Sequence, residues 1–333
     1  MNKEYSINRM DDQSALVTGG AGFIGSNLVH QLVALGAKVT VYDCLLDGYG
    51  GNLANLKEIN DKIQFVKGDI RDIDLLKVHV REKDFIFNYA SQVSHIDSMS
   101  NPFLDIDINC RGHMSLLEAC RKYNDSVKIV YNATRGQVGE SKYTPVDENH
   151  PDNPPDVYGI NKLAAEKYHL LYHKVYGIKT TSIRMNNTYG PRHQMKHGKY
   201  GILNWFIRRA MLSEVIEVYG DGSQTRDYNY VDDANDAALL AAQSERSNGE
   251  VFLLGSGEEI KFIDMVQLVL KAVGSGEYKQ IPWPSGREAI DVKNFYVSFE
   301  KINKTLHWYP KTDLRSGLKK TVDFYRERLS EYI

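Results

Sequence analysis

A glycine-rich turn near the N-terminus places the strongest constraint on the fold of this chain. Residues 18–25 read TGGAGFIG and stand between a short apolar run and an amphipathic run. Glycines three apart permit a tight strand-to-helix turn and close approach of a phosphate, and the helix N-terminus attracts that phosphate. The sequence therefore predicts a turn that holds a dinucleotide pyrophosphate, and its predicted contacts are Gly19, Gly22, Phe23, Ile24 and Gly25.

Short apolar runs alternate with helical patterns through the first half of the chain. Six runs are predicted to be buried strands: 15–17, 38–42, 63–66, 84–88, 127–131 and 180–184. Helical patterns cover 23–35, a long segment that ends at 123, and the segment after 158. Strands that alternate with helices indicate an α/β fold with an open, parallel, doubly wound sheet of the Rossmann type.

The pattern changes at about residue 186, where loops rich in Gly, His and Tyr begin. We expect residues 14–185 to form an NAD-binding Rossmann domain, with return segments near 226–245. Residues 186–330 are expected to form a smaller C-terminal α/β cap that binds the substrate and is interleaved with the first domain.

An acidic residue at the end of the second predicted strand indicates which dinucleotide is bound. Asp43 lies 24 residues after Gly19. A carboxylate there accepts hydrogen bonds from a ribose diol and repels a 2′-phosphate, which favours NAD over NADP. Asp69 and Ile70 follow the third strand and can reach the adenine, although Asp69 is almost as well suited to cap a helix.

Polar residues after the fourth predicted strand are candidates for the nicotinamide side of the cofactor. Ala90, Ser91 and Gln92 follow that strand directly. Asn109 lies inside the long helical pattern, where it can kink the helix or bond a neighbouring loop. The alternative for Asn109 is an ordinary polar position on an exposed helix face.

The candidate chemistry rests on Tyr158 and Lys162, which share one face of a predicted helix. An ammonium beside a phenol lowers its pKa, and the phenolate can then take a proton from a hydroxyl of a sugar. Such a pair also occurs on ordinary solvated helices. Thr134, 24 residues upstream at the end of a predicted strand, offers a hydroxyl that both donates and accepts hydrogen bonds.

Composition excludes several other classes of protein. The formal net charge of −2 creates no field that favours nucleic acid or an anionic membrane. The three cysteines are scattered, so a disulfide framework or a zinc site is not expected, and a cytoplasmic location is the simplest reading. The first dozen residues lack the apolar run of a signal peptide, and no run approaches the roughly 18 apolar residues of a membrane span.

Many segments in order make the chain resemble the extended short-chain dehydrogenase/reductase family, in its nucleotide-sugar epimerase and dehydratase branch (UDP-glucose 4-epimerase-like). The resemblance runs from residue 14 to about residue 325. Its segments include VTGGAGFIGSNL, GDIRD, DINCRGHMSLLEACR, YGINKLAAEKY, RMNNTYGPR and YGDGSQTRDYNYVDD.

The resemblance implies a role for each matching residue. Tyr158 would be the base, Lys162 would bond the nicotinamide ribose, and Thr134 would bond the reacting sugar oxygen. The residues implied to hold the diphosphate of a nucleotide-diphosphate sugar are Asn187, Arg226 and Arg287. The resemblance also implies a homodimer in which the helix that ends at 123 and the helix after 158 pair across a two-fold axis.

The residues after Thr134 depart from the family pattern and favour one reaction. Family members that eliminate water carry an Asp-Glu pair there, and decarboxylases carry a Glu two residues after the threonine. This chain has Arg135 and Gly136. The leading hypothesis is an NAD-dependent epimerase that oxidises a sugar carbon, most commonly C4, and returns the hydride to its other face.

Other functions on the same scaffold stay open. They are a 4,6-dehydratase, which would recruit its acid and base from residues such as Glu140, Asp97 or His95, a decarboxylase, and a sugar 4-dehydrogenase. A catalytically silent NAD sensor is a further alternative. The sequence does not identify the nucleotide base, the sugar or the carbon that reacts.

Overall fold

A computed structural model describes residues 5–283 and 294–333. Its centre is a seven-stranded sheet in the order β11-β6-β5-β4-β1-β2-β3, and every neighbouring pair is parallel. The strands are β1 (Ser14–Thr18), β2 (Lys38–Asp43), β3 (Ile63–Lys67), β4 (Phe85–Asn88), β5 (Lys128–Thr134), β6 (Lys179–Met185) and β11 (Val251–Leu254).

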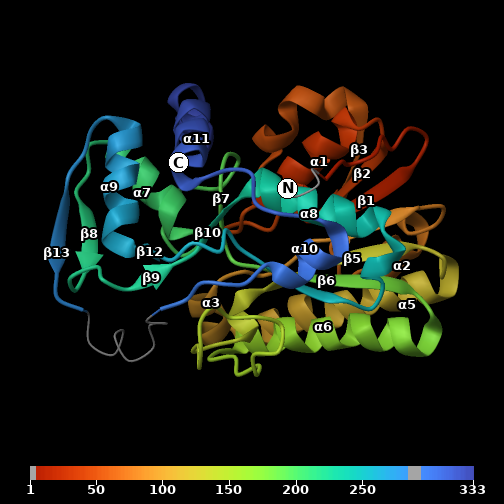
Figure 1. Ribbon diagram of the computed structural model, residues 1–333. Coiled ribbons are helices and arrows are strands. Elements are labelled where there is room, and N and C mark those ends of the chain that lie inside the picture. The colour runs from red at the N-terminus through yellow and green to blue at the C-terminus, as the bar shows by residue number, and fades with distance from the viewer. Residues whose placement is uncertain (1–4, 284–293) are drawn as a thin grey trace.

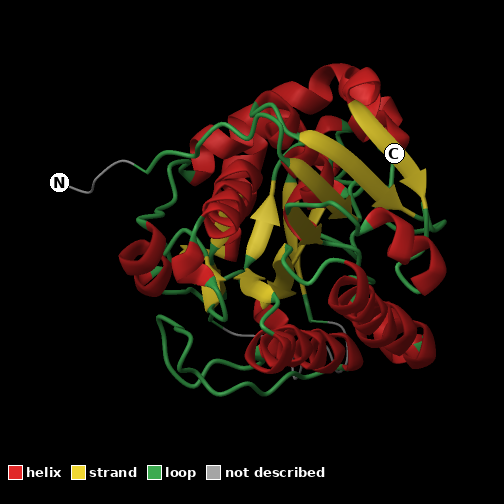
Figure 2. Ribbon diagram, turned by 90° about the vertical axis from the view of Figure 1, so that its right-hand side faces the viewer, coloured by secondary structure: helices red, strands yellow, loops and turns green. Residues whose placement is uncertain are grey.

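Helices cover both faces of this sheet, as Figures 1 and 2 show. One face packs against α1 (Phe23–Ala34), α8 (Val231–Gln243) and α10 (Glu300–Leu306). The other face packs against α2 (Ile73–His79), α5 (His113–Tyr123) and α6 (Val157–Tyr176). An apolar core lies on each face of the sheet, and adjacent residues of β1 contribute to both. Val17 packs in the core beside α1, and Leu16 packs in the core beside α5. Strands buried on both faces read as continuous apolar runs, which is why their positions are visible in the sequence.

The remaining C-terminal elements enclose a separate apolar core beside the sheet (Figure 1). They comprise β7 (Asn187–Tyr189), α7 (Ile202–Met211), β8 (Ile216–Tyr219), β9 (Thr225–Arg226), β10 (Tyr228–Tyr230), β12 (Ile260–Lys261), α9 (Phe262–Val273), β13 (Tyr278–Ile281), α11 (Leu314–Arg328) and η6 (Leu329–Glu331). These strands pair two by two, as β7 with β10, β9 with β12, and β8 with β13.

Short helices complete the connections. They are η1 (Leu53–Lys62), α3 (His95–Ser100), α4 (Pro102–Ile106), η2 (Asp107–Gly112), η3 (Arg135–Gln137) and η4 (Glu245–Ser247). The η2 segment is π-helical and joins α4 to α5, so the long predicted helix is interrupted. Such π-helical segments are frequent at functional sites.

The predicted doubly wound parallel sheet is confirmed, and each of the six predicted strands coincides with one of β1 to β6. The seventh strand, β11, and the covering helix α10 come from beyond the return segments that the sequence indicates. Within residues 5–283 and 294–333, every helix is too short or too polar to cross a membrane.

A buried ion-pair cluster fixes α6 to the sheet. Arg184 on β6 donates to Glu166 on α6 at 2.7 Å and to Asp152 at 2.7 Å. Glu166 is fully buried and Arg184 is 4% exposed. The arginine lowers the pKa of the Glu166 carboxyl against the effect of burial. Because burial of an uncompensated charge is costly, this cluster makes the position of α6 depend on charge pairing.

A buried histidine makes acid stability a test of the packing beneath α6. The His169 ring stacks on Tyr131, its Nε2 accepts from Asn88, and its Nδ1 donates to the Ala165 carbonyl. Burial lowers the pKa of His169 to about 4. Above pH 6.5 the His169 ring is neutral in both the folded and the unfolded chain, so it does not change the free energy of unfolding. As the pH falls from about 6.5 to 4, the unfolded chain binds a proton that the folded chain does not bind, so the free energy of unfolding falls.

We therefore expect the His169→Gln variant to lose less stability than the wild-type protein between pH 7.5 and pH 4.5. The expected difference approaches roughly 3 kcal/mol in the free energy of unfolding. Urea unfolding at the two pH values measures it, and the exposed His307, replaced by Asn, serves as the control. An equal loss in the wild-type protein and in the His169→Gln variant would contradict the assignment.

Candidate active site

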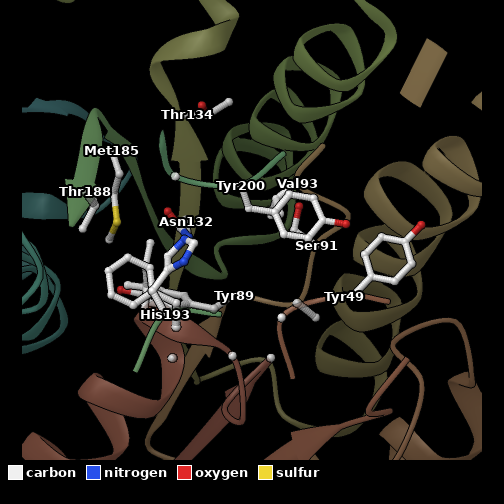
Figure 3. Close-up of a pocket in the computed structure, with 18 of the residues that line it drawn as sticks. Tyr49, Tyr89, Ser91, Val93, Asn132, Thr134, Met185, Thr188, His193 and Tyr200 are labelled. Atoms are coloured by element: carbon white, nitrogen blue, oxygen red, sulfur yellow. The ribbon is translucent and has the colours of Figure 1, made fainter. Parts of the chain in front are cut away.

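A cavity of about 440 Å³ opens at the carboxyl ends of the sheet strands. Its wall includes the glycine turn after β1 and residues that follow β2, β3, β4, β5 and β6. Strand order reverses between β1 and β4, and ligands of open α/β sheets bind at such a switch point. Figure 3 shows labelled wall residues from both halves of the chain, among them Ser91, Thr134 and His193.

The glycine turn requires its glycines for steric reasons. Gly19 has a φ of +67°, and a Cβ there would lie 2.8 Å from the backbone of Tyr89 and Ala90. A Cβ on Gly25 would collide with the Gly19 carbonyl oxygen. Gly22 precedes α1 without a side-chain cap, so no side chain occupies the N-terminus of the helix. All five predicted turn residues line the cavity, and the turn fits a pyrophosphate.

Asp43 lies in the cavity wall with its carboxylate fixed by the backbone. Its Oδ2 accepts from Ala21 N at 3.0 Å and its Oδ1 accepts from Leu45 N at 2.9 Å. Burial raises the pKa of the Asp43 carboxyl, and the two backbone donors oppose that shift. The donors leave acceptor capacity on both oxygens, which suits a ribose diol.

Asp69 and Ile70 also line the cavity. Asp69 forms a bidentate pair with Arg71 at 2.6 and 2.9 Å, and this pairing lowers the pKa of its carboxyl. The alternative role of Asp69 as a helix cap is wrong, because the N-cap of α2 is Asp72.

The four residues predicted for the nicotinamide side of the cofactor lie in two different places. Ala90 and Ser91 line the cavity, whereas Gln92 and Asn109 do not. Asn109 is fully buried in η2, where it accepts from the Ser91 hydroxyl at 2.7 Å and donates to the Gln92 carbonyl at 3.0 Å. The exposed alternative for Asn109 is therefore wrong. The Gln92 side chain bonds the backbone of Ser94. The side-chain amides of Gln92 and Asn109 therefore hold the loop after β4 in place from outside the cavity wall.

Thr134 and Tyr158 meet in the cavity wall. Thr134 ends β5, and Tyr158 is the second residue of α6, whose N-cap is Asp156. Burial raises the pKa of Tyr158 to about 12, while a hydrogen bond with the Thr134 side chain acts in the opposite direction. The arrangement places a phenol and a secondary hydroxyl side by side at the end of the sheet.

The structure places the Lys162 ammonium on a backbone carbonyl. Lys162 is 2% exposed, its Nζ donates to the Asn132 carbonyl at 2.6 Å, and its ammonium lies 4.4 Å from the Tyr131 ring centroid. Burial lowers the pKa of Lys162 to about 7. The charge of Arg135 is one of the influences that oppose the rise in the pKa of Tyr158. Spacing on a helix predicts a shared face, and it does not predict where a four-carbon side chain ends.

Glu140, Asp97 and His95 are the residues named above as a possible acid and base of a dehydratase. Of these three, His95 alone lies in the cavity wall. Its ring packs edge-on against Tyr158 at 4.9 Å, and its Nδ1 lies 2.5 Å from Asp156 Oδ2. Asp97 lies outside the wall and bonds Lys199 at 2.9 Å. Glu140 is exposed and is also absent from the wall.

The predicted substrate residues occupy different positions. Asn187 lines the cavity and donates to the Asp227 carbonyl at 3.0 Å. Arg226 lies outside the wall on β9. Burial raises the pKa of Tyr228, which does line the cavity, and the charge of Arg226 opposes that shift. Arg287 lies outside the described residues.

Sequence reasoning did not single out several wall residues. Tyr49 and Tyr200 stack with ring centroids 6.4 Å apart, from loops 151 positions apart (Figure 3). Lys199 lines the cavity beside them. The contact between the loop of Tyr200 and the loop of Tyr49 leaves no signal in the sequence of either segment.

The fold and this cavity define a class of protein, the Rossmann-type dinucleotide-binding proteins with an additional substrate-side core. The model of the GDP-mannose 4,6 dehydratase family matches residues 16–321. The chain belongs to this family, which is part of the extended short-chain dehydrogenase/reductases.

Known relatives within the family include both epimerases and dehydratases. The UDP-glucose 4-epimerase of Mycolicibacterium smegmatis is 35% identical over 94% of this chain and 98% of its own length. A dTDP-glucose 4,6-dehydratase of an Actinoplanes species is 31% identical over 95% of this chain and 98% of its own. The solved UDP-glucose 4-epimerase of Thermus thermophilus, in complex with NAD, is 32% identical with a TM-score of 0.84, covering 95% of this chain and all of its own.

Proposed function

We propose that this protein is an NAD-dependent nucleotide-sugar epimerase, with C4 as the favoured centre. One observation carries the proposal: Tyr158 and Thr134 meet in the same cavity as the glycine turn and Asp43, and the two residues after Thr134 are not carboxylic acids. The kinship with epimerases supports it.

The described residues fit NAD. The turn from Gly19 to Gly25 would hold the pyrophosphate and Asp43 the adenosine ribose, while Asp69 and Ile70 would lie at the adenine. Ala90 and Ser91 would border the nicotinamide side, supported from behind by Gln92 and Asn109. Bound NAD supplies the hydride acceptor and hydride donor of the reaction.

The chain itself handles the proton. Tyr158 takes the proton of the sugar hydroxyl as that carbon is oxidised, and returns it when the keto-sugar is reduced on its other face. Thr134 donates a hydrogen bond to the reacting oxygen and holds it against Tyr158. Lys162 has a pKa of about 7, so a small favourable interaction is enough to keep it charged as a partner of the nicotinamide ribose.

The substrate side of the cavity would receive the nucleotide-diphosphate sugar. We assign Asn187, Arg226 and Arg287 to the diphosphate, because amide and guanidinium donors suit phosphate oxygens. We also propose the division into an NAD-binding part, 14–185 with return segments near 226–245, and a substrate cap, 186–330. A cytoplasmic location is consistent with the three free cysteines Cys44, Cys110 and Cys120.

Dehydration is a second candidate because of His95. A histidine paired with Asp156 and packed on Tyr158 can donate a proton to a leaving hydroxyl. Mass spectrometry of the product separates the two reactions. The proposal predicts a product of unchanged mass, and loss of one water from the sugar would establish the dehydratase instead.

Neutralising Asp43 is expected to change the choice of cofactor. We expect Asp43→Asn to weaken NAD binding by about 10- to 100-fold and to raise the relative affinity for NADP, because a charged acceptor is lost and repulsion of a 2′-phosphate ends. Calorimetric titration of cofactor-free protein measures both constants. The exposed Asp47, replaced by Asn, is a matched control in the next loop. An unchanged ratio of the two affinities would rule out this role for Asp43.

We propose a homodimer that uses the exposed apolar residues of α4 and α6. Phe103 is 79% exposed, and Leu171 and Val175, one helical turn apart on α6, are 51% and 58% exposed. Exposed apolar side chains on neighbouring helices are typical of protein–protein contacts when they form one surface. Light scattering should report a dimer for the wild-type protein and a monomer for Leu171→Glu/Val175→Glu, with Lys319→Glu on α11 as control. A monomeric wild-type protein would refute the proposal.

A further inference from the structure

Arg135 leaves the backbone at a rigid point directly after Thr134. The Thr134 hydroxyl accepts from Gly136 N at 3.1 Å, and Thr134 N donates to the Gln137 side chain at 3.0 Å. These reciprocal bonds form a capping box at the start of η3. The arginine therefore starts from a fixed position next to the reacting residues, and its side chain lines the cavity.

An apolar wall positions the guanidinium. Its Cζ lies 4.9 Å from the ring centroid of Phe295, which is fully buried among Val138, Val146 and Leu253. A guanidinium is weakly hydrated and stacks well on an aromatic ring. Against such a wall, a charge-assisted hydrogen bond to a ligand is stronger than one formed in water.

The charge of Arg135 lies on the sugar side of the proposed substrate site. Arg135 directly follows Thr134 and lines the cavity, and its charge opposes the burial that raises the pKa of Tyr158. Arg226 and Arg135 both oppose the burial that raises the pKa of Tyr228. Arg226 lies outside the cavity wall and is better placed for a group farther from the chemistry.

Neighbouring polar groups also suit an anion. Within residues 5–283 and 294–333, the buried Tyr228 hydroxyl and the buried Asn186 Nδ2 find no hydrogen-bond partner, and both residues line the cavity. Both groups can donate. Among the described wall residues, the carboxylates are Asp43, which ends β2, and Asp69, which follows β3, both at the cofactor end. The sugar end thus combines a cation and two unused donors.

We infer that the sugar of the substrate carries a carboxylate beside the reacting carbon, as in a nucleotide-diphosphate uronic acid, and that Arg135 binds this carboxylate. The inference rests on the proposed epimerase function. A C5 carboxylate lies next to C4, so a residue that adjoins Tyr158 and Thr134 can reach it. The planar guanidinium pairs with a carboxylate through two parallel hydrogen bonds.

The test compares UDP-glucose with UDP-glucuronate in the NAD-loaded protein, for the wild type and for Arg135→Gln, Arg135→Lys and the control Arg246→Gln. Arg246 is exposed and lies outside the cavity wall. We expect the wild-type kcat/KM to favour the uronate. Arg135→Gln should lower activity on both sugars, because the charge also acts on Tyr158, but the loss on the uronate should be about 30-fold greater. Arg135→Lys should recover part of the preference.

The possible negative results distinguish failure of the inference about Arg135 from failure of the proposed epimerase function. Wild-type turnover of UDP-glucose with none of UDP-glucuronate would overturn the inference and leave the epimerase standing. Equal losses on both sugars in Arg135→Gln would also overturn it, since Arg135 would then serve a group common to both substrates, such as the diphosphate. Absence of turnover with either sugar, repeated with the dTDP-, GDP- and CDP-linked pairs, would refute the epimerase and with it the inference.

Discussion

Replacing Tyr158 with phenylalanine should lower kcat by about 10²- to 10⁴-fold, the range expected when a general base is removed. The change deletes only the hydroxyl that meets Thr134 in the cavity, and the ring can keep its edge-on contact with His95. Binding of NAD and of the nucleotide sugar should change by much less, so KM is expected to stay within a few-fold. Steady-state kinetics on the sugar that the wild-type protein converts best measures both constants.

The exposed tyrosine Tyr143 provides the matched control, since Tyr143→Phe removes a phenol outside the cavity wall. Its kcat should equal that of the wild-type protein. If Tyr158→Phe retained more than about a tenth of the wild-type kcat, Tyr158 would not be the base, and His95 would become the candidate to test.

The second large effect concerns stability. Arg184→Met should lower the free energy of unfolding by about 3 to 5 kcal/mol, because it leaves the fully buried Glu166 without its partner. The double variant Arg184→Met/Glu166→Gln should recover a large part of this loss, since no uncompensated charge then remains on α6. Arg184 and Glu166 both lie outside the cavity wall.

Urea unfolding at pH 7.5 measures these free energies. Lys319→Met, which breaks an exposed pair with Asp323 on α11, should change stability by less than about 1 kcal/mol. A loss of under about 1 kcal/mol for Arg184→Met would show that the buried cluster does not hold α6 to the sheet.

The parts of the fold that follow local rules are readable in the sequence. Parallel strands buried on both faces appear as apolar runs, and the turn after β1 needs glycine at Gly19 and Gly25 because backbone from another segment lies against them. The family resemblance then supplies roles for Thr134, Tyr158 and Lys162, and these assignments stay predictions until kinetics test them.

The parts that depend on side-chain paths are not readable in this way. Lys162 shares a helix face with Tyr158, but its ammonium ends at the Asn132 carbonyl. Asn109 turns inward because η2 is π-helical, and sequence spacing gives no sign of that interruption. The contact between Tyr49 and Tyr200 joins two loops that lie 151 positions apart in the sequence.

Reversible oxidation with return of the same hydride distinguishes an epimerase from the other enzymes of this family. The decisive measurement is NMR of the product formed from a nucleotide sugar deuterated at C4, with the NAD-loaded protein in ordinary water. We expect an inverted C4 that still carries the deuterium, in a sugar of unchanged mass. Loss of water, appearance of solvent hydrogen at C4, or a stable keto-sugar as the end product would contradict it.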